Sequence, residues 1–167
     1  MTAKHRRYFL KDKETKTLLS HLSEKLRLSL EQTFGSKISL EVVQTGSVEL
    51  YLVNGEPVLA RTDRDLFPTL DFKGFFALAP KAVVDMGAVP YVCKGANVMA
   101  PGIKRFEGDF KKGDIVLVVD EKHGKALAIG EVLYDSEEAK NVKQGIVIRN
   151  IHFVSDQVWG FMKQIAH

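Results

Sequence analysis

The sequence predicts an α+β protein of two small units, in which a helix on an antiparallel sheet precedes a pseudo-β-barrel of short strands. Three observations lead to this prediction. The only long helical pattern lies near the N-terminus, hairpin signals follow it, and the second half alternates short apolar runs with turn residues. The 167 residues suffice for two units of about 80 residues each, and we expect them to span residues 1–76 and 77–167.

Leucines at regular spacing predict the first helix. They occupy positions 18, 19, 22, 26 and 30, and Phe34 continues the row. A spacing of three and four residues places them on one helical face, which would cover a sheet. We predict a single helix over Lys16–Phe34, capped at its start by Thr15 or Thr17 and ended by Gly35.

A three-stranded meander is predicted after this helix. Its strands are expected at residues 38–44, 48–53 and 57–61. Thr45-Gly46 is a plausible turn between the first two, and Asn54-Gly55 is the strongest hairpin signal in the chain, because both residues tolerate positive φ. We expect a further short helix to begin at Pro68.

The second half predicts short strands between turn residues, an arrangement typical of a small barrel. The run IVLVV is apolar on both faces, as in a strand that is covered on both sides. Gly130 marks a bend or a close backbone approach. Helices are expected at residues 79–88, entered through Pro80, and at 136–142 and 155–164. Strands are expected at residues 89–93, 102–106, 114–120, 126–134 and 145–153.

Composition excludes several classes of protein. Hydrophobic residues make up 45% and charged residues 27%, which is typical of a folded domain. No apolar run approaches the length of a membrane span, so we expect no membrane association. The N-terminus lacks the apolar core of a signal peptide, and the single Cys93 cannot form an internal disulfide. We therefore expect a cytoplasmic protein.

Catalytic, metal and cofactor motifs are absent from the sequence. It contains neither of the glycine-rich phosphate-binding patterns, and no two histidines lie three or four residues apart. Cys93 and His152 could form a nucleophile pair, but a buried Cys93 and a hydrogen-bonded structural His152 are favoured. We expect no enzymatic activity, no cofactor and no metal.

The segment KGANVMAPGIKRFEGDFKKGD, residues 94–114, indicates nucleic-acid binding. Gly95 and Gly102 would let a bulky partner approach the backbone, and Asn97 offers a donor and an acceptor to base edges. The alternative is that the glycines only turn corners and the cations are ordinary surface. Five basic side chains of the segment could neutralise phosphates, namely Lys94, Lys104, Arg105, Lys111 and Lys112.

Four stretches together resemble the PUA domain. They are VDMGAVPYVCKGANVMAPGI, KGDIVLVVDE, ALAIGEV and NVKQGIVIRNIHF, and they cover about residues 80–153. With VNGE at 53–56 and FPTL at 67–70, almost the whole chain resembles the malignant-T-cell-amplified-sequence proteins, which combine a pre-PUA and a PUA domain. Eukaryotic members act in ribosome recycling and non-standard initiation, together with a protein that carries an SUI-type domain.

This resemblance implies a non-enzymatic RNA-binding protein of the translation apparatus, which would bind a tRNA 3′ end or small-subunit ribosomal RNA. It leaves open whether the ribosome or an SUI-domain protein is a partner. The segment from 94 to 105 holds no aromatic residue for stacking. The implied RNA-binding residues are Lys94, Gly95, Ala96, Asn97, Met99, Pro101, Gly102, Lys104, Arg105, Ile148 and Arg149.

Two other functions stay open at this point. PUA domains also occur in pseudouridine synthases and transglycosylases, so the chain could be an accessory protein or an enzyme of RNA modification. It could also be an adaptor that binds proteins through the N-terminal sheet and the leucine-rich helix.

Overall fold

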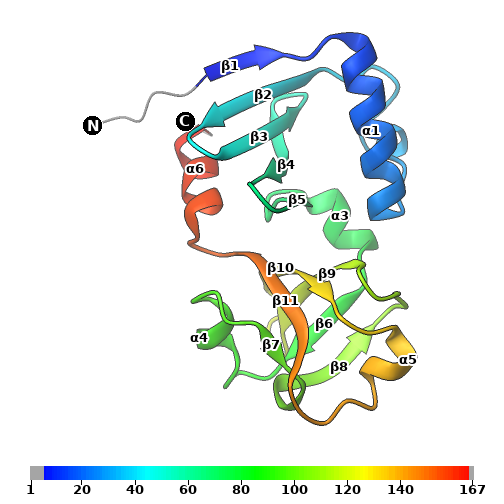
Figure 1. Cartoon of the computed structure of the whole chain (residues 1–167), viewed down its shortest axis with the longest axis vertical. Helices are drawn as coiled ribbons and strands as arrows, with labels where there is room; N and C mark the ends of the chain where they lie inside the picture. Colours follow the sequence, from blue (N-terminus) through cyan, green and yellow to red (C-terminus); the bar gives the residue numbers. More distant parts are fainter. Residues whose placement is uncertain (1–5, 166–167) are drawn as a thin grey trace. The chain divides into compact units, whose positions relative to one another are not determined.

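The computed structural model describes residues 6–165, and the chain divides into two compact units, Met1–Gly74 and Phe75–His167 (Figure 1). The α+β class predicted from the sequence is confirmed. We refer to the two parts as the N-terminal unit and the C-terminal unit. The helix α3 (Lys73–Leu78) contains the point at which the chain passes from one to the other.

The N-terminal unit is an antiparallel sheet with two helices. Its strands follow the order β1-β2-β3-β4-β5, so each strand pairs with its neighbour in the sequence. The predicted meander is its centre, and strands at both edges were not foreseen. The elements are β1 (Arg6–Phe9), α1 (Asp12–Leu26), α2 (Leu30–Phe34), β2 (Leu40–Thr45), β3 (Val48–Val53), β4 (Glu56–Arg61) and β5 (Leu66–Pro68).

The prediction of one helix over residues 16–34 is wrong, because the helix breaks at Arg27. This residue has φ 56°, in the left-handed region, and ends α1. The Ser29 hydroxyl then accepts a hydrogen bond from the Gln32 backbone N–H and starts α2. The leucine spacing nevertheless identified the buried face, since Leu22 and Leu30 are 0% and 1% exposed.

Turn chemistry decides the connections of this sheet. Asn54 and Gly55 have φ 51° and 88°, which matches the predicted hairpin between β3 and β4. The preceding turn lies at Gly46 and Ser47, one residue later than predicted. No helix begins at Pro68, which lies on the short edge strand β5, where a missing N–H costs no ladder hydrogen bond.

The C-terminal unit is a curved sheet with the strand order β7-β11-β10-β9-β6-β8. All pairs are antiparallel except β6 with β9. One apolar cluster from these strands, α4 and α5 forms its core. The elements are β6 (Lys81–Val84), α4 (Val89–Val92), β7 (Val98–Met99), the 3-10 helix η1 (Ala100–Gly102), β8 (Ile103–Glu107), β9 (Ile115–Asp120), β10 (Ala126–Val132), α5 (Ser136–Ala139), β11 (Ile146–Phe153) and α6 (Gln157–Ile165).

The predicted helix and strand between residues 79 and 93 are both wrong, and they are exchanged. Residues 81–84 form β6, whose Ala82, Val83 and Val84 are buried because β8 and β9 flank the strand. The next segment forms α4, where Pro90 lies in the first turn and its missing N–H has no helical partner to lose.

Other predictions for this unit are confirmed. Every residue of β9 is buried. The register shifts between Ile129 and Gly130, and a Cβ on Gly130 would collide with Ile148, so a close approach does require glycine there. The short helices α5 and α6 lie where the sequence predicted them. None of the helices described is long and apolar enough to cross a membrane.

Candidate nucleic-acid interface

The segment singled out by the sequence forms a bend after α4, followed by β7 and η1. Gly95 has φ 95°, and a Cβ at this position would lie 2.9 Å from Cε1 of Phe153. A Cβ on Gly102 would lie 3.1 Å from that of Ala88. Both glycines are therefore explained by internal packing, which supports the alternative reading that they turn corners.

Two asparagines hold this bend against β11. Oδ1 of Asn97 accepts a hydrogen bond from the Asn150 backbone N–H at 2.9 Å. The Asn150 side-chain amide donates to the carbonyl oxygens of Val92 and Ala96, at 3.1 and 3.0 Å. The Asn97 oxygen therefore has a structural role in holding the bend, and its contact with a base edge stays a prediction.

A groove of about 370 Å³ lies beside η1. Its surface is mostly apolar, and its one carboxylate, Asp85, accepts the Ala88 backbone N–H at 2.8 Å. The groove is open, and acidic groups do not surround it. Its lining residues are Asp85, Gly87, Ala88, Tyr91, Val92, Ala96, Asn97, Val98, Met99, Pro101 and Gly102.

Tyr91 is a groove residue that the sequence analysis did not propose. Its side chain is 67% exposed, and it lines the groove from α4, together with the half-exposed Met99 of β7. Assigning residues 89–93 to a strand hid this position, because aromatic side chains were sought only between 94 and 105. A ring exposed beside an apolar groove is suited to stacking on an unpaired base.

Three of the implied cations have carboxylate neighbours. The Nζ atom of Lys104 lies 4.0 Å from Glu121, and Nε of Arg105 lies 3.2 Å from Glu107. Nε of Arg149 lies 3.3 Å from Oε1 of Glu131. The pairs of Lys104 and Arg105 are exposed and contribute little, so these two cations remain able to bind phosphate, whereas the pair of Arg149 is partly buried.

The structure places five of the eleven implied residues in the groove, and it places Lys104 and Arg105 at a separate, smaller cavity. Ala96, Asn97, Met99, Pro101 and Gly102 line the groove. Ile148 is 0% exposed and belongs to the core, so its inclusion in an RNA-binding surface is wrong. The alternation of β11 explains this error, because the pattern did not tell which of its residues face inward.

Nucleophilic chemistry finds no support at Cys93 and His152. The buried His152 shares a hydrogen bond of 2.8 Å between Nδ1 and Oδ2 of Asp156. Burial raises the pKa of Asp156, but hydrogen bonds from His152 and two backbone N–H groups outweigh it, so the pKa lies below its usual range. Burial raises the pKa of the Cys93 thiol, which disfavours the thiolate. Residues 6–165 contain no cluster of acidic, His or Cys side chains able to hold a metal.

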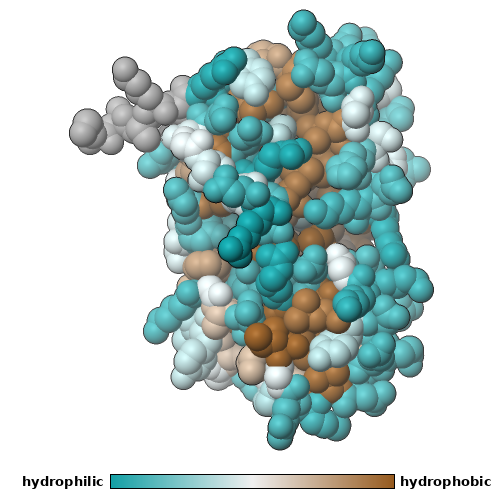
Figure 2. Space-filling model, viewed as in Figure 1, coloured by the Kyte–Doolittle hydropathy of each residue, from teal (hydrophilic) through white to brown (hydrophobic). Residues whose placement is uncertain are grey.

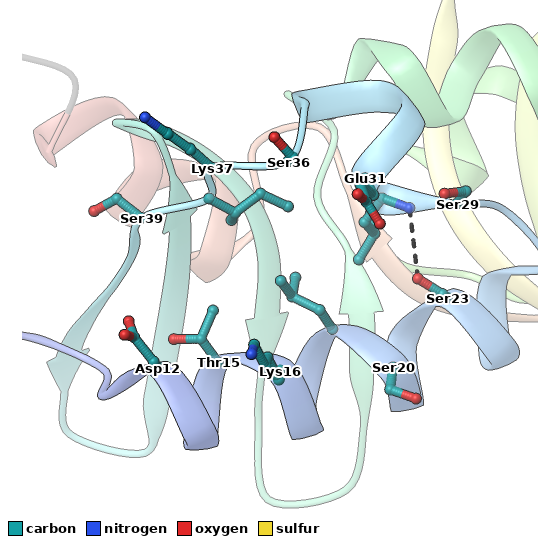
Figure 3. A pocket seen from close by; sticks show the side chains of 13 residues that line it. Asp12, Thr15, Lys16, Ser20, Ser23, Ser29, Glu31, Ser36, Lys37 and Ser39 are labelled. Atoms are coloured by element: carbon teal, nitrogen blue, oxygen red, sulfur yellow. Dashed lines mark hydrogen bonds between the residues drawn. The ribbon is translucent and has the colours of Figure 1, made fainter.

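A larger cavity lies in the N-terminal unit. It has a volume of about 730 Å³ and separates α1 from α2 and residues 36–39. Figure 3 shows hydroxyl groups and both signs of charge around it. Leu19, Leu30 and Ile38 supply its apolar part. We call this space the N-terminal cavity.

Comparisons with known proteins agree with the fold. Residues 80–154 match the PUA domain family, and residues 6–72 match a family described as a domain of unknown function, DUF1947. An uncharacterized protein of Methanocaldococcus jannaschii is 35% identical over 93% of this chain and 96% of its own. Translation machinery-associated protein 20 of Saccharomyces cerevisiae is 32% identical over 94% and 93%.

A solved PUA-domain structure from Aeropyrum pernix K1, described as a tartrate complex, has the same architecture. Its TM-score is 0.86 and its identity 28%, over 99% of this chain and 95% of that one. The C-terminal unit with its groove thus defines a PUA-domain protein. The chain as a whole belongs to the family of translation machinery-associated protein 20 and malignant T-cell-amplified sequence 1, which confirms the resemblance found in the sequence.

Proposed function

We propose that this protein is a non-enzymatic RNA-binding component of the translation machinery. In this proposal the groove beside η1 holds an unpaired RNA segment, from a tRNA 3′ end or from small-subunit ribosomal RNA. The open, apolar groove with the exposed Tyr91 is the observation that carries the proposal. Paired RNA helices hide their base edges, whereas unpaired bases can enter a groove and stack on an aromatic ring.

The family supports a role related to translation. Relatives that match along most of their length are named for the translation machinery and not for an enzymatic activity. We propose that residues 77–167 hold the RNA and residues 1–76 orient the protein or contact a partner, such as the ribosome or an SUI-domain protein. Such a role would place the protein in the cytoplasm.

Electrostatics favour modest affinity. The chain has a net charge of +3, and three of the cations implied by the resemblance have carboxylate neighbours. Few phosphates would be neutralised, so the salt dependence of binding should be real but shallow. Partner contacts would then supply the rest of the affinity on the ribosome.

Filter binding to tRNA and to small-subunit RNA tests the proposal. A triple variant, Lys94→Ala with Lys104→Ala and Arg105→Ala, should weaken binding and flatten its salt dependence. The matched control removes three exposed cations of the N-terminal unit, by Lys13→Ala, Lys37→Ala and Arg64→Ala. Equal affinities of both variants and the unchanged protein would contradict the proposal.

A further inference from the structure

A second cavity, of about 270 Å³, lies on the other flank of η1. Figure 2 shows an apolar area bordered by hydrophilic side chains between β11 and α5 of this unit. Met99, Pro101 and Gly102 line the groove already described, whereas Ala100 and Ile103 line the second cavity. The single turn of η1 therefore separates two concave surfaces.

The floor of the second cavity is apolar and firmly supported. Ile103 and Phe106 come from β8, and both are partly buried against the core of the unit. Ala139 and Val142, from α5 and the residues after it, close the other side. A floor that belongs to the core keeps its shape when a ligand binds, so little ordering cost opposes binding there.

The rim of this cavity is cationic. Lys104, Arg105 and Lys140 all line it. Nζ of Lys140 lies 3.7 Å from a carboxylate oxygen of Glu137, which is 88% exposed, so this pair resembles the weak pairs of the other two cations. An anionic ligand would meet three cations whose present partners contribute little to stability.

An apolar floor below a cationic rim fits a flat apolar group that carries a phosphate. A nucleotide has this chemistry. Residues that line the two surfaces are immediate neighbours in the sequence, since Pro101 and Gly102 line the groove and Ala100 and Ile103 line the second cavity, so neighbouring nucleotides of one unstacked strand could lie on the two flanks of η1. We infer that a single RNA strand crosses η1, with one base beside Tyr91 and the next nucleotide over the second cavity, its phosphate near Lys104 and Lys140.

This inference rests on the proposed function and adds a second nucleotide seat to it. It predicts that affinity depends on α5, an element outside the segment from 94 to 105. The test compares Lys140→Ala with Lys143→Ala, because Lys143 is an exposed cation three residues further on that does not line the cavity. The probes are a single-stranded RNA tetranucleotide and a mononucleotide, titrated at several salt concentrations.

We expect Lys140→Ala to weaken tetranucleotide binding about threefold to tenfold and to lower the salt slope by about 1, with the mononucleotide unaffected. Lys143→Ala should change neither probe more than about twofold. Thermal unfolding measurements check that both variants are folded. Equal effects of the two lysine variants would overturn the second seat.

Tyr91→Ala separates failure of this inference from failure of the proposed function. If Tyr91→Ala weakens both probes while the two lysine variants behave alike, only the second seat is lost. If no variant alters RNA binding, the groove is not an RNA site and both proposals fall. An acidic peptide with an aromatic side chain that displaces RNA and binds more tightly, in a Lys140-dependent manner, would assign the cavity to a protein partner and overturn the inference.

Discussion

The N-terminal cavity and the groove beside η1 differ in size and in chemistry. The cavity, about 730 Å³, is twice as large as the groove, about 370 Å³. Its surroundings mix Asp12 and Glu31 with Lys16 and Lys37, so the charges offset one another. The groove combines a mostly apolar surface with an exposed aromatic ring, and its lining contains a single charged residue, Asp85. We assign RNA to the smaller of the two surfaces because of its side-chain chemistry and not because of its volume.

Substitution of Gly95, in the bend that shapes the groove, should have the largest effect, which is a loss of stability. Gly95→Ala adds a Cβ against Phe153 to a left-handed backbone, and we expect a loss of about 3 kcal/mol in the free energy of unfolding. Gly113→Ala is the matched control, because Gly113 has φ 92° but no atom within 4 Å of the added Cβ. It should cost about 1 kcal/mol, measured by urea denaturation. Equal losses would show that packing on Phe153 does not shape the bend.

Removal of the aromatic ring should have the next largest effect. Tyr91→Ala is expected to weaken binding of single-stranded RNA by about 1–3 kcal/mol, the contribution of one stacked base. Because Tyr91 is exposed, stability should change little. Tyr91→Phe keeps the ring and should retain most of the affinity, as measured by fluorescence anisotropy. If the phenylalanine variant binds as poorly as the alanine variant, stacking is not the interaction.

Removing the Asp156 carboxylate at the start of α6 should lower the free energy of unfolding by a smaller amount, and this loss should depend on pH. Asp156 accepts bonds from His152, Phe153 and Trp159, and its pKa is lowered in the folded state. A lowered pKa means that the carboxylate stabilises the fold above about pH 3.9 and that this contribution is lost as the pH falls below that value. Asp156→Asn should therefore cost about 1 kcal/mol at pH 7.

Chemical denaturation at several pH values checks this sign. The difference between Asp156→Asn and the unchanged protein should shrink as the solution becomes more acidic than the Asp156 pKa. A difference that stays constant down to strongly acidic pH would mean that the charge of Asp156 is not what stabilises this turn.

Obstructing the N-terminal cavity should have the smallest effect, because we expect it to leave the RNA affinity almost unchanged. Ser20 is exposed and lines this cavity, so Ser20→Tyr would obstruct it without disturbing the core. We expect the RNA affinity to change less than about twofold, since the substitution lies far in sequence from the groove and alters no charge. A large loss of affinity would move the RNA site to the larger cavity and reverse the comparison.

Much of the fold was predictable from local patterns. The hairpin at Asn54-Gly55 follows from the positive φ that both residues tolerate, and the two-sided burial of β9 follows from an uninterrupted apolar run. The sequence also predicted that Gly130 marks a bend or a close backbone approach, and the structure shows the close approach. These features depend on the conformational preferences of one or a few residues, which the sequence states directly.

The candidate site was predictable only in part. Part of the segment from 94 to 105 lines the groove, but Asn97 also holds the bend and Ile148 belongs to the core. Tyr91 and Lys140 were missed, because neither lies in the segment that carried the motif. Exposure and hydrogen-bond partners are properties of the folded chain, and no spacing rule assigns them.

The amino-acid sequence by itself determined the family, the α+β class, the hairpin and the apolar strands, because these depend on short-range preferences and on patterns that relatives share. The tertiary structure decided that residues 81–84 are a strand and 89–92 a helix. The physical reason is that an apolar run of four residues suits either state, and the flanking strands β8 and β9 supply the hydrogen-bond partners that select one. The same long-range pairing brings α4, η1 and α5 together, and with them the two concave surfaces that we assign to RNA.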